Sequence, residues 1–370
     1  MGDPTGTEAA DVRSLLRVAD FEAAARGCLP QMAFDYYAGG AGDEITLAEN
    51  VRAFDRWLIR PRVLVDVSAP DLSTTVLGEP VSFPVLLAPT AMQALAHPDG
   101  EAASARAAAS QGTLMILSTI STVALEPVAG TGVSRWFQLY IHRDRTMTAD
   151  LVRRAEASGY TAIVLTVDAP FLGRRFRDER NRFILPPGLS LANLAGAALP
   201  ESTGSSLFAY FASELDPSLT WDDVEWLRSL SSLPVLVKGV MTAEDAELAV
   251  KAGVAGVVVS NHGGRQLDGV LASIDALSDV SDAVAGRAEV YMDGGVRRGT
   301  DVFRALALGA RAVLIGRPAL WGLAVGGEGG VRRVLEILRD ELALTMALAG
   351  RPNVEAVDRS VLVRTPRAEG

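Results

Sequence analysis

The stretch Gly256-Val-Val-Val-Ser-Asn-His-Gly-Gly-Arg-Gln266 joins an apolar, β-branched run directly to a glycine-rich turn that carries a histidine and an arginine. A run that is apolar throughout, instead of alternating with polar residues, is typical of a strand in a parallel sheet covered on both faces. The turn after it carries the polar side chains of His262 and Arg265, which are not suited to packing in an apolar core. The stretch therefore predicts a buried parallel strand whose carboxyl end presents reactive side chains.

Seven further apolar runs occur along the chain. Together with Gly256–Val259 they are Val81–Ala88, Leu114–Leu117, Arg135–Leu139, Ala162–Val167, Val235–Val237, Val290–Met292 and Ala312–Ile315. Helical patterns lie between them, at 100–111, 149–158, 243–251, 273–284 and 300–308. Eight β-α units without a reversal in rhythm favour an α/β fold with a closed (β/α)₈ TIM barrel, and an open doubly wound sheet is the alternative.

The remaining segments complete the expected organisation of one domain, residues 12–366. Residues 1–75 are expected to form a helical lead-in, with helical patterns at 12–26 and 32–37, and residues 76–366 the barrel. A connection rich in Leu, Ala, Ser and Gly follows the fourth run at about 186–220. Because loops of this length often act as lids, we expect a mobile cover over the barrel mouth.

Composition narrows the classes of protein. The chain has 370 residues, 49% of them hydrophobic and 22% charged, which is typical of a folded globular protein. A net charge of −10 argues against nucleic acid as the main partner. No uncharged apolar stretch reaches the roughly 20 residues that span a bilayer, so a membrane partner is not expected. A single cysteine, Cys28, and a start without a signal-peptide pattern predict a cytoplasmic protein.

Polar or backbone-exposing groups follow every apolar run, as a barrel active site requires. They are Pro89-Thr90-Ala91, Ser118-Thr119, Gln138-Leu139-Tyr140, Thr166-Val167-Asp168, Lys238-Gly239, Ser260-Asn261-His262, Asp293-Gly294-Gly295 and Gly316-Arg317. Arg297 and Arg317 stand beside glycines after the last two runs, where barrels often bind phosphate. These loops predict a phosphorylated cofactor or substrate, and the alternative is that the glycines only form tight turns.

Several cations at this rim invite a chemical role. Lys238 ends an apolar run and suits either a Schiff-base nucleophile or a fixed cation that stabilises negative charge. Arg174, Arg175 and Arg265 fit a carboxylate substrate, because planar guanidinium groups hold carboxylates with paired hydrogen bonds. Surface ion pairs are the alternative for these arginines.

His262 is the strongest general-base candidate among the three histidines, because an imidazole with a pKa near ~6.5 suits proton transfer at neutral pH. His97 precedes a helix start and His142 follows the third run, so structural or capping roles suit them better. The sequence shows no metal-ligand spacing, nucleophile elbow, P-loop or dinucleotide fingerprint. Hydride or carbanion chemistry on an organic cofactor remains.

The motifs together resemble one family. Ser260-Asn-His-Gly-Gly-Arg-Gln266, with Ala88-Pro-Thr-Ala-Met92, Leu165-Thr-Val-Asp168, Leu236-Val-Lys-Gly239, Asp293-Gly-Gly-Val-Arg-Arg-Gly299 and Ile315-Gly-Arg-Pro318, is similar to the FMN-dependent α-hydroxy acid oxidases and dehydrogenases of glycolate oxidase type. The resemblance covers about residues 21–360 and implies a barrel with FMN at its mouth. The cofactor contacts that it implies are Pro89, Thr90, Ala91, Ser118, Gln138, Thr166, Lys238, Ser260, Asp293, Gly294, Gly295, Val296, Arg297, Gly316 and Arg317.

The same resemblance implies roles in catalysis. The catalytic set is His262, Tyr140, Asp168 and Arg265, and the substrate-binding set is Tyr36, Tyr140, Arg175, His262 and Arg265. The arginines would bind the substrate carboxylate, the histidine would take a proton, and Asp168 would support the imidazolium. Lys238 would stabilise the reduced flavin near N1 and O2. Hydride and carbanion routes both remain open.

One residue departs from the glycolate-type members: Ile120 stands where they carry a tryptophan. Loss of an indole should open space, and Ala91, Phe171 and Phe176 could shape an aryl pocket there. We therefore expect an aromatic (S)-2-hydroxy acid, 4-hydroxymandelate or mandelate, to be oxidised by O₂ with release of H₂O₂. The product 4-hydroxybenzoylformate would be a precursor of hydroxyphenylglycine in antibiotic biosynthesis. The resemblance also implies a homotetramer.

Alternative functions share this fold. A dehydrogenase of the same family would use another acceptor, and an aliphatic hydroxy acid oxidase would use a smaller substrate. Phosphosugar aldolases and flavin-dependent isomerases are also barrels, and an aldolase would react through Lys238. A flavin-binding barrel without catalysis should lack part of the reactive set, but His262, Arg265, Arg175 and Tyr140 are all present.

Overall fold

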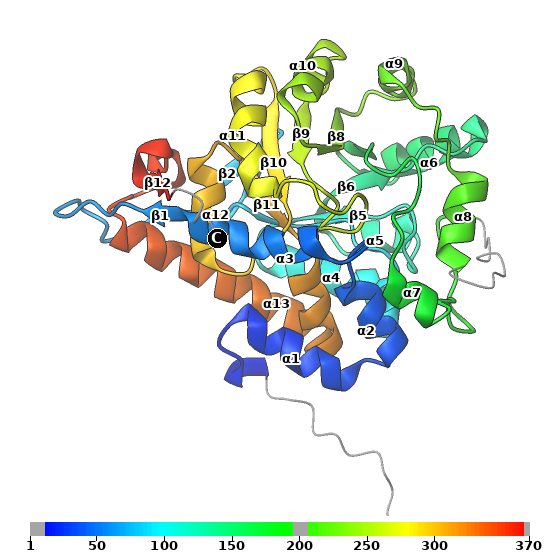
Figure 1. Ribbon diagram of the computed structural model, residues 1–370, viewed down its shortest axis with the longest axis horizontal. Coiled ribbons are helices and arrows are strands. Elements are labelled where there is room, and N and C mark those ends of the chain that lie inside the picture. Colours follow the sequence, from blue (N-terminus) through cyan, green and yellow to red (C-terminus); the bar gives the residue numbers. More distant parts are fainter. Residues whose placement is uncertain (1–11, 195–205, 366–370) are drawn as a thin grey trace, which may run out of the picture.

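A closed parallel barrel forms the centre of the computed structural model, which describes residues 12–194 and 206–365 (Figure 1). In chain order its strands are β4 (Val85–Leu87), β5 (Leu114–Leu117), β6 (Ser134–Leu139), β7 (Ile163–Thr166), β8 (Val235–Val240), β9 (Gly256–Val259), β10 (Glu289–Asp293) and β11 (Ala312–Ile315). Each strand pairs in parallel with the next, and β11 pairs with β4. The predicted (β/α)₈ barrel is confirmed.

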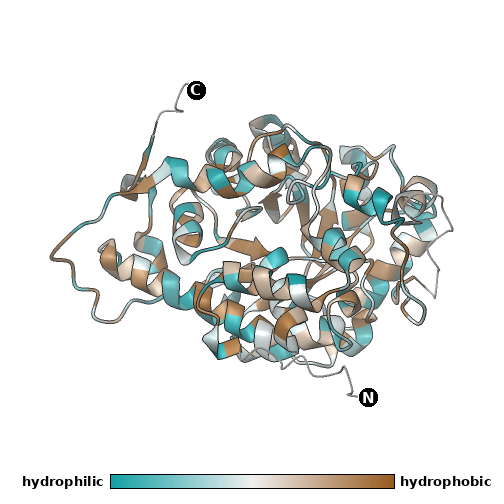
Figure 2. Cartoon of the chain, turned by 60° about the horizontal axis from the view of Figure 1, so that its bottom comes forward, coloured by the Kyte–Doolittle hydropathy of each residue, from teal (hydrophilic) through white to brown (hydrophobic). Residues whose placement is uncertain are grey.

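Helices surround the strands and turn their hydrophilic residues outward (Figure 2). They are α4 (Gly100–Ser110), α5 (Leu125–Ala129), α6 (Arg145–Ala157), α7 (Phe176–Arg180), α9 (Trp221–Ser229), α10 (Ala243–Lys251), α11 (Ser273–Val284), α12 (Gly299–Ala307) and α13 (Arg317–Leu348). α10 and α11 have the bounds that their apolar periodicity predicts. Thr242 starts α10, because its hydroxyl accepts a hydrogen bond from the Asp245 N–H at 3.2 Å.

Buried side chains fill the space inside the barrel, so the mouth at the strand ends is the expected place for a ligand. Trp136 and Tyr291 meet edge to face there, with ring centroids 5.4 Å apart. A hairpin of β2 (Thr74–Val76) and β3 (Glu79–Val81) adds Val76 and Val81 to the same buried cluster. Since the Leu77 N–H donates to Glu289 at the start of β10, this hairpin closes the amino-terminal end.

The first barrel strand is shorter than the run Val81–Ala88 predicts. Val81 belongs to β3, and the barrel strand begins only at Val85. Pro84 lies between them, and proline cannot donate a hydrogen bond to a sheet. Residues 82–84 therefore separate the hairpin from the barrel.

The helical lead-in is also shorter than expected. It consists of η1 (Val12–Ser14), α1 (Val18–Cys28), α2 (Gln31–Ala38), α3 (Ile45–Arg52) and η2 (Ala53–Arg56). The prediction that it extends to residue 75 is wrong, because β1 (Trp57–Ile59) follows and pairs antiparallel with β12 (Leu362–Arg364). This pairing places the segment after the lead-in helices beside the last strand of the described chain.

The connection predicted at about 186–220 is not a simple loop. It contains α8 (Ser206–Glu214), and residues 195–205 lie outside the described part. Asn193 fixes the segment before α8, because its side-chain amide donates to the carbonyls of Ser118 and Thr119 at 3.2 Å. The connection thus contains a helix, and its role as a mobile cover stays a prediction.

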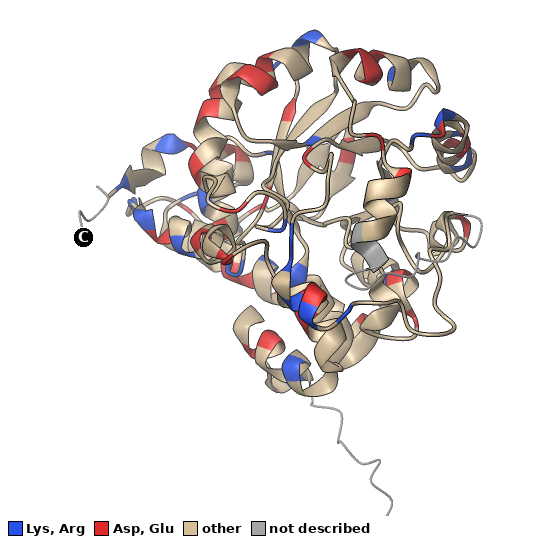
Figure 3. Ribbon diagram, turned by 45° about the vertical axis from the view of Figure 1, so that its right-hand side comes forward, with Lys and Arg blue, Asp and Glu red and all other residues tan. Residues whose placement is uncertain are grey.

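The outer surface carries charges of both signs. Figure 3 shows acidic and basic residues interspersed on the outer helices of the face in view. Within residues 12–194 and 206–365, no helix combines the length and the apolar composition that crossing a membrane requires.

Candidate active site

A cavity opens at the carboxyl ends of the strands, the face of a barrel at which ligands bind. It gathers residues from the ends of β4, β5, β6, β8, β9, β10 and β11, together with α2. Twelve of the predicted cofactor residues line it: Pro89, Thr90, Ala91, Ser118, Lys238, Asp293, Gly294, Gly295, Val296, Arg297, Gly316 and Arg317. Of the other three, Gln138 and Ser260 hydrogen-bond to the wall residues Ser118 and Lys238, and Thr166 hydrogen-bonds to Gln138.

Gln138 organises the wall between β5, β6 and β7. Its Oε1 accepts hydrogen bonds from Ser118 Oγ at 3.2 Å and from the Thr119 N–H at 3.1 Å. Its Nε2 donates to Thr166 Oγ1 at 3.0 Å. The amide is therefore fixed in orientation, which suits a wall that positions a planar cofactor.

Lys238 is held as a cation. Its Nζ lies 3.0 Å from Asp293 Oδ2 and donates to Ser260 Oγ at 2.9 Å. Burial lowers the pKa of Lys238, but the carboxylates of Asp293 and Asp168 outweigh it, so the pKa is raised above its ordinary value. A Schiff-base nucleophile must be a neutral amine. The structure therefore favours the fixed cation over the aldolase role.

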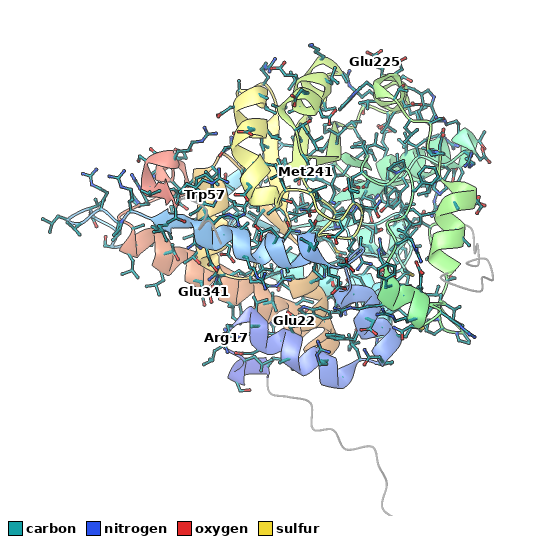
Figure 4. All side chains as sticks on the ribbon, in the orientation of Figure 1. Arg17, Glu22, Trp57, Glu225, Met241 and Glu341 are labelled. Atoms are coloured by element: carbon teal, nitrogen blue, oxygen red, sulfur yellow. The ribbon has the colours of Figure 1, made fainter. Side chains whose placement is uncertain are left out.

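Arg297 and Arg317 make one end of the cavity strongly basic. Arg317 donates to the carbonyls of Tyr37, Gly263 and Gly39, each at 2.9 Å. Burial, followed by repulsion from Arg265 and Arg297, lowers the pKa of Arg317. Glu22, labelled on α1 in Figure 4, partly offsets this loss. Guanidinium groups brought together in this way are stabilised by an anion such as phosphate.

Asp293 and its neighbours fit the ribityl part of FMN. Asp293 Oδ1 is buried and has no hydrogen-bond partner among the described residues, so it can accept a ligand hydroxyl. A side chain at position 295 would collide with α3, because a Cβ there would lie 1.9 Å from the Asn50 carbonyl oxygen. Packing therefore requires a glycine at 295, and the predicted contact of Gly295 with the cofactor stays a prediction.

His262 and Asp168 form the reactive pair. His262 Nδ1 lies 2.8 Å from Asp168 Oδ1, which places the proton on Nδ1 and leaves the lone pair on Nε2. Burial lowers the pKa of His262, and Asp168 offsets this only in part. Burial raises the pKa of Asp168, but His262 and Lys238 lower it by more. The net pKa is below the ordinary value, so Asp168 is a carboxylate. A neutral imidazole at neutral pH is suited to accept a proton.

The loop that carries His262 is hydrogen-bonded to the loop that follows β7. His262 has a φ of 56°, a left-handed conformation that is uncommon outside glycine. Gln266 Nε2 donates to the Asp168 carbonyl at 2.9 Å and to the Phe171 carbonyl at 2.8 Å. Sequence reasoning quoted Gln266 within the motif but gave it no role, and the structure makes it the link between the two catalytic loops.

Arg175 and Arg265 lie together at the cavity. Arg265 Nη1 donates to the Tyr36 carbonyl at 2.7 Å and the Gly39 carbonyl at 3.0 Å, and its guanidinium lies 5.0 Å from the centre of the Tyr36 ring. Burial, then Arg265, lowers the pKa of Arg175 to about 10, so Arg175 remains a cation at neutral pH. Arg174 instead forms an exposed ion pair with Glu179. The geometry selects the first two for a carboxylate.

Tyr36 and Tyr140 line the cavity as neutral phenols. Burial raises the pKa of both hydroxyls above the ordinary value. Tyr36 stacks on Phe183 with ring centroids 4.5 Å apart, which fixes its plane. Each hydroxyl can therefore donate a hydrogen bond to a substrate oxygen.

An apolar wall of Ile120, Leu172 and Phe211 completes the cavity. Ala91 also lines it, as predicted. Phe171 does not: it is 63% exposed, because the bond from Gln266 to its carbonyl turns the loop so that Leu172 faces inward. Phe176 likewise lies outside the lining and packs under Arg174. Sequence reasoning missed Leu172, one position away, and Phe211, which has no local signal.

The other histidines and possible metal ligands lie apart from this chemistry. His97 Nδ1 accepts a hydrogen bond from the Asp99 N–H at 3.2 Å, within the loop before α4, so of its two expected roles the structure favours the loop role over capping. His142 is buried away from the cavity lining. In the described ranges, no three His, Cys, Asp or Glu side chains are arranged to hold a metal ion.

The barrel and its site define an oxidoreductase class that binds a phosphorylated organic cofactor. Comparison with known proteins agrees, since a family model described as FMN-dependent dehydrogenase matches residues 25–364. The chain belongs to the FMN-dependent 2-hydroxy acid oxidase family. It is an FMN-dependent (S)-2-hydroxy acid oxidase, and the basic end, Asp293 and Lys238 fit FMN.

Relatives and solved structures differ in the substrates of their names. A protein named L-lactate oxidase from Nostoc sp. is 56% identical over 95% of this chain and 99% of its own length. Glycolate oxidase 1 from Oryza sativa subsp. japonica is 56% identical over 94% of this chain and 95% of its own length. A crystal structure of mandelate oxidase with (S)-4-hydroxymandelic acid is 46% identical, with a TM-score of 0.91, and covers 94% of this chain and 98% of that one.

Proposed function

We propose that this oxidase acts on an aromatic (S)-2-hydroxy acid, 4-hydroxymandelate or mandelate. The product is the 2-oxo acid, 4-hydroxybenzoylformate in the first case, and O₂ is reduced to H₂O₂. The observation that carries this proposal is the apolar wall of Ile120, Leu172 and Phe211 in the same cavity as Arg175 and Arg265. The likeness to mandelate oxidase supports it.

The residues divide the work according to their charge states. Arg175 and Arg265 hold the carboxylate, and the phenols of Tyr36 and Tyr140 donate to substrate oxygens. His262 Nε2 accepts the proton, and the Asp168 carboxylate stabilises the imidazolium that forms. FMN, when bound, accepts the two electrons. Arg297 and Arg317 would hold its phosphate, and Lys238 would stabilise negative charge on its ring.

A second candidate is oxidation of a small aliphatic acid. The 56% identity to proteins named L-lactate oxidase and glycolate oxidase favours it. An aliphatic substrate would leave the apolar wall without contacts, since that wall is suited to a larger side chain. If the first candidate is right, aromatic acids gain transition-state binding from the wall and aliphatic acids do not. If the second is right, the wall gives aromatic acids no such advantage.

Parallel kinetics on four substrates test the proposal: (S)-mandelate, (S)-4-hydroxymandelate, L-lactate and glycolate. We expect kcat/KM to be at least about tenfold higher for the aromatic acids, because burial of an aryl ring contributes more than about 1.4 kcal/mol. The same enzyme, reduced anaerobically and then mixed with air, should reoxidise rapidly. Higher kcat/KM for lactate or glycolate would establish the aliphatic alternative, and reoxidation only by an added dye would indicate a dehydrogenase.

We also propose the expected homotetramer, supported by an apolar loop that projects beside β1 (Figure 1). Val63 is 80% exposed in this loop, and Leu64 is fully exposed. Exposed apolar groups of this kind mark contact surfaces. Light scattering should give a tetramer for the wild type and a smaller species for Leu64→Asp. A monomeric wild type would refute the proposal. The cytoplasmic location stays a prediction.

A further inference from the structure

His142 is a buried histidine that the proposed chemistry does not use. Its side chain lies just beyond Tyr140, after the end of β6, and is 1% exposed. Its Nε2 lies 3.0 Å from the hydroxyl of Tyr210, which is on α8. Burial lowers the pKa of His142, so the ring is neutral in this contact. The bond thus joins the barrel rim to the helix that follows residue 205.

Backbone contacts bring the same two segments together. His142 forms an isolated antiparallel bridge with Leu215, next to the end of α8. The Arg143 N–H donates to the Glu214 carbonyl at 2.9 Å, and the Asp216 N–H donates to the Ile141 carbonyl at 3.1 Å. These bonds hold the last residues of α8 and the segment after it. The bond from His142 to Tyr210 holds α8 at a second point, about one turn before Glu214.

Phe211 follows Tyr210 directly and connects this bond with the active site. Its side chain is 3% exposed and lines the cavity. Its ring packs edge to face against Tyr140, with centroids 5.2 Å apart at 73°. A shift of α8 at Tyr210 must therefore move Phe211 relative to Tyr140 and open the apolar wall.

We propose that His142 is a positioning residue for substrate selection: its hydrogen bond to Tyr210 holds Phe211 against Tyr140 and so shapes the side of the cavity that receives the substrate's aryl group. The inference rests on the proposed aromatic substrate. Aromatic rings favour edge-to-face contacts, and a ring fixed before binding loses less conformational entropy when the substrate arrives. Small hydroxy acids bind at the arginines and do not reach this wall.

Tyr210→Phe removes the hydroxyl and keeps the ring, which makes it the sharpest test. Loss of the bond leaves the His142 nitrogen buried without a partner. We expect the Kd of benzoylformate, read from the absorbance of the bound flavin, to rise about fivefold or more, and that of glyoxylate less than about twofold. The ratio of kcat/KM for (S)-mandelate to that for glycolate should fall by a similar factor.

Two further variants separate positioning from general stability. His142→Leu should reproduce the loss of selectivity, whereas His142→Gln, whose amide can reach the Tyr210 hydroxyl, should restore the wild-type ratio to within about twofold. Tyr160→Phe is the matched control. Tyr160 is also buried, and its hydroxyl donates to the Leu125 carbonyl at 2.9 Å, but it does not line the cavity. Its substitution should affect both ligands equally.

The outcomes distinguish this inference from the proposed function. Equal weakening of benzoylformate and glyoxylate in Tyr210→Phe, or an equal loss of selectivity in Tyr160→Phe, would refute the positioning role. A wild type that prefers glycolate to mandelate would refute the aromatic substrate instead. In that case the change of the benzoylformate to glyoxylate Kd ratio on substitution still decides whether His142 positions Phe211.

Discussion

Substitution of Asp168 by asparagine tests the charge state on which the proposed proton transfer depends. Asp168 Oδ1 lies 2.8 Å from His262 Nδ1, and Oδ2 is buried without a hydrogen-bond partner among the described residues. Asparagine keeps an oxygen that can accept from Nδ1–H. It removes the negative charge that stabilises the protonated imidazole after the base has acted.

The expected loss lies between two limits. Exchange of a charge-assisted hydrogen bond for a neutral one costs about 1.5 kcal/mol, or roughly tenfold in rate. A full charge pair at about 4 Å and an effective dielectric constant of about 20 is worth about 4 kcal/mol, or roughly a thousandfold. The rate constant of flavin reduction should fall within this range. Since Asp168 raises the pKa of His262, its loss should also move the acid limb of the pH profile to lower pH.

Anaerobic stopped-flow measurement with (S)-mandelate gives this rate constant from the absorbance of the bound flavin, after the FMN content has been matched to that of the wild type. Asp144→Asn is a suitable control, because Asp144 is an exposed helix cap whose Oδ1 accepts from the Thr146 N–H at 2.8 Å. It should leave the rate unchanged. A reduction rate for Asp168→Asn within about threefold of wild type, with an unmoved acid limb, would refute the reasoning.

Three other changes extend the test. In the wild type, kcat/KM for (S)-mandelate should be level near neutral pH and fall with unit slope only at a pH below the ordinary imidazole pKa of about 6.5, because burial holds the pKa of His262 below that value and protonation removes the base; a profile that rises toward acid would contradict a neutral base. Ile120→Trp should lower kcat/KM for mandelate about tenfold or more and affect glycolate less, because the indole fills the aryl space; unchanged mandelate turnover would count against that space. Lys238→Met leaves the Asp293 carboxylate buried without its cation, so urea unfolding should show a loss of about 3–5 kcal/mol together with faster FMN release. An unchanged unfolding midpoint and FMN release would show that the pair is not needed.

Much of the barrel is predictable because its signals are local. The apolar runs at β5, β9 and β11 have the bounds that the structure assigns, and so do α10 and α11. A strand covered on both faces must be apolar at every position, and a helix against a sheet needs apolar residues every three or four positions. The first strand was predicted too long because the run from Val81 to Ala88 joins the end of the hairpin to the barrel strand, and both are apolar.

The site was less completely predictable. The rim residues follow from the rule that strand carboxyl ends meet at one face, and the motif around His262 indicates their chemistry. The direction of one side chain within a loop does not follow from either. Phe171 was expected at the cavity, but the hydrogen bonds of Gln266 turn Leu172 inward and leave Phe171 exposed.

The sequence by itself determined the eightfold alternation of strands and helices, the polar residues at the strand ends and the resemblance to flavin-dependent hydroxy acid oxidases. The tertiary structure decided that Lys238 is a cation held by Asp293, that Gly295 makes room for Asn50, and that Phe211 of α8 forms a wall of the cavity. The physical reason is the range of the interactions. Periodicity and turn chemistry depend on neighbours in the chain, whereas charge states, close approaches and cavity walls depend on groups that only folding brings together.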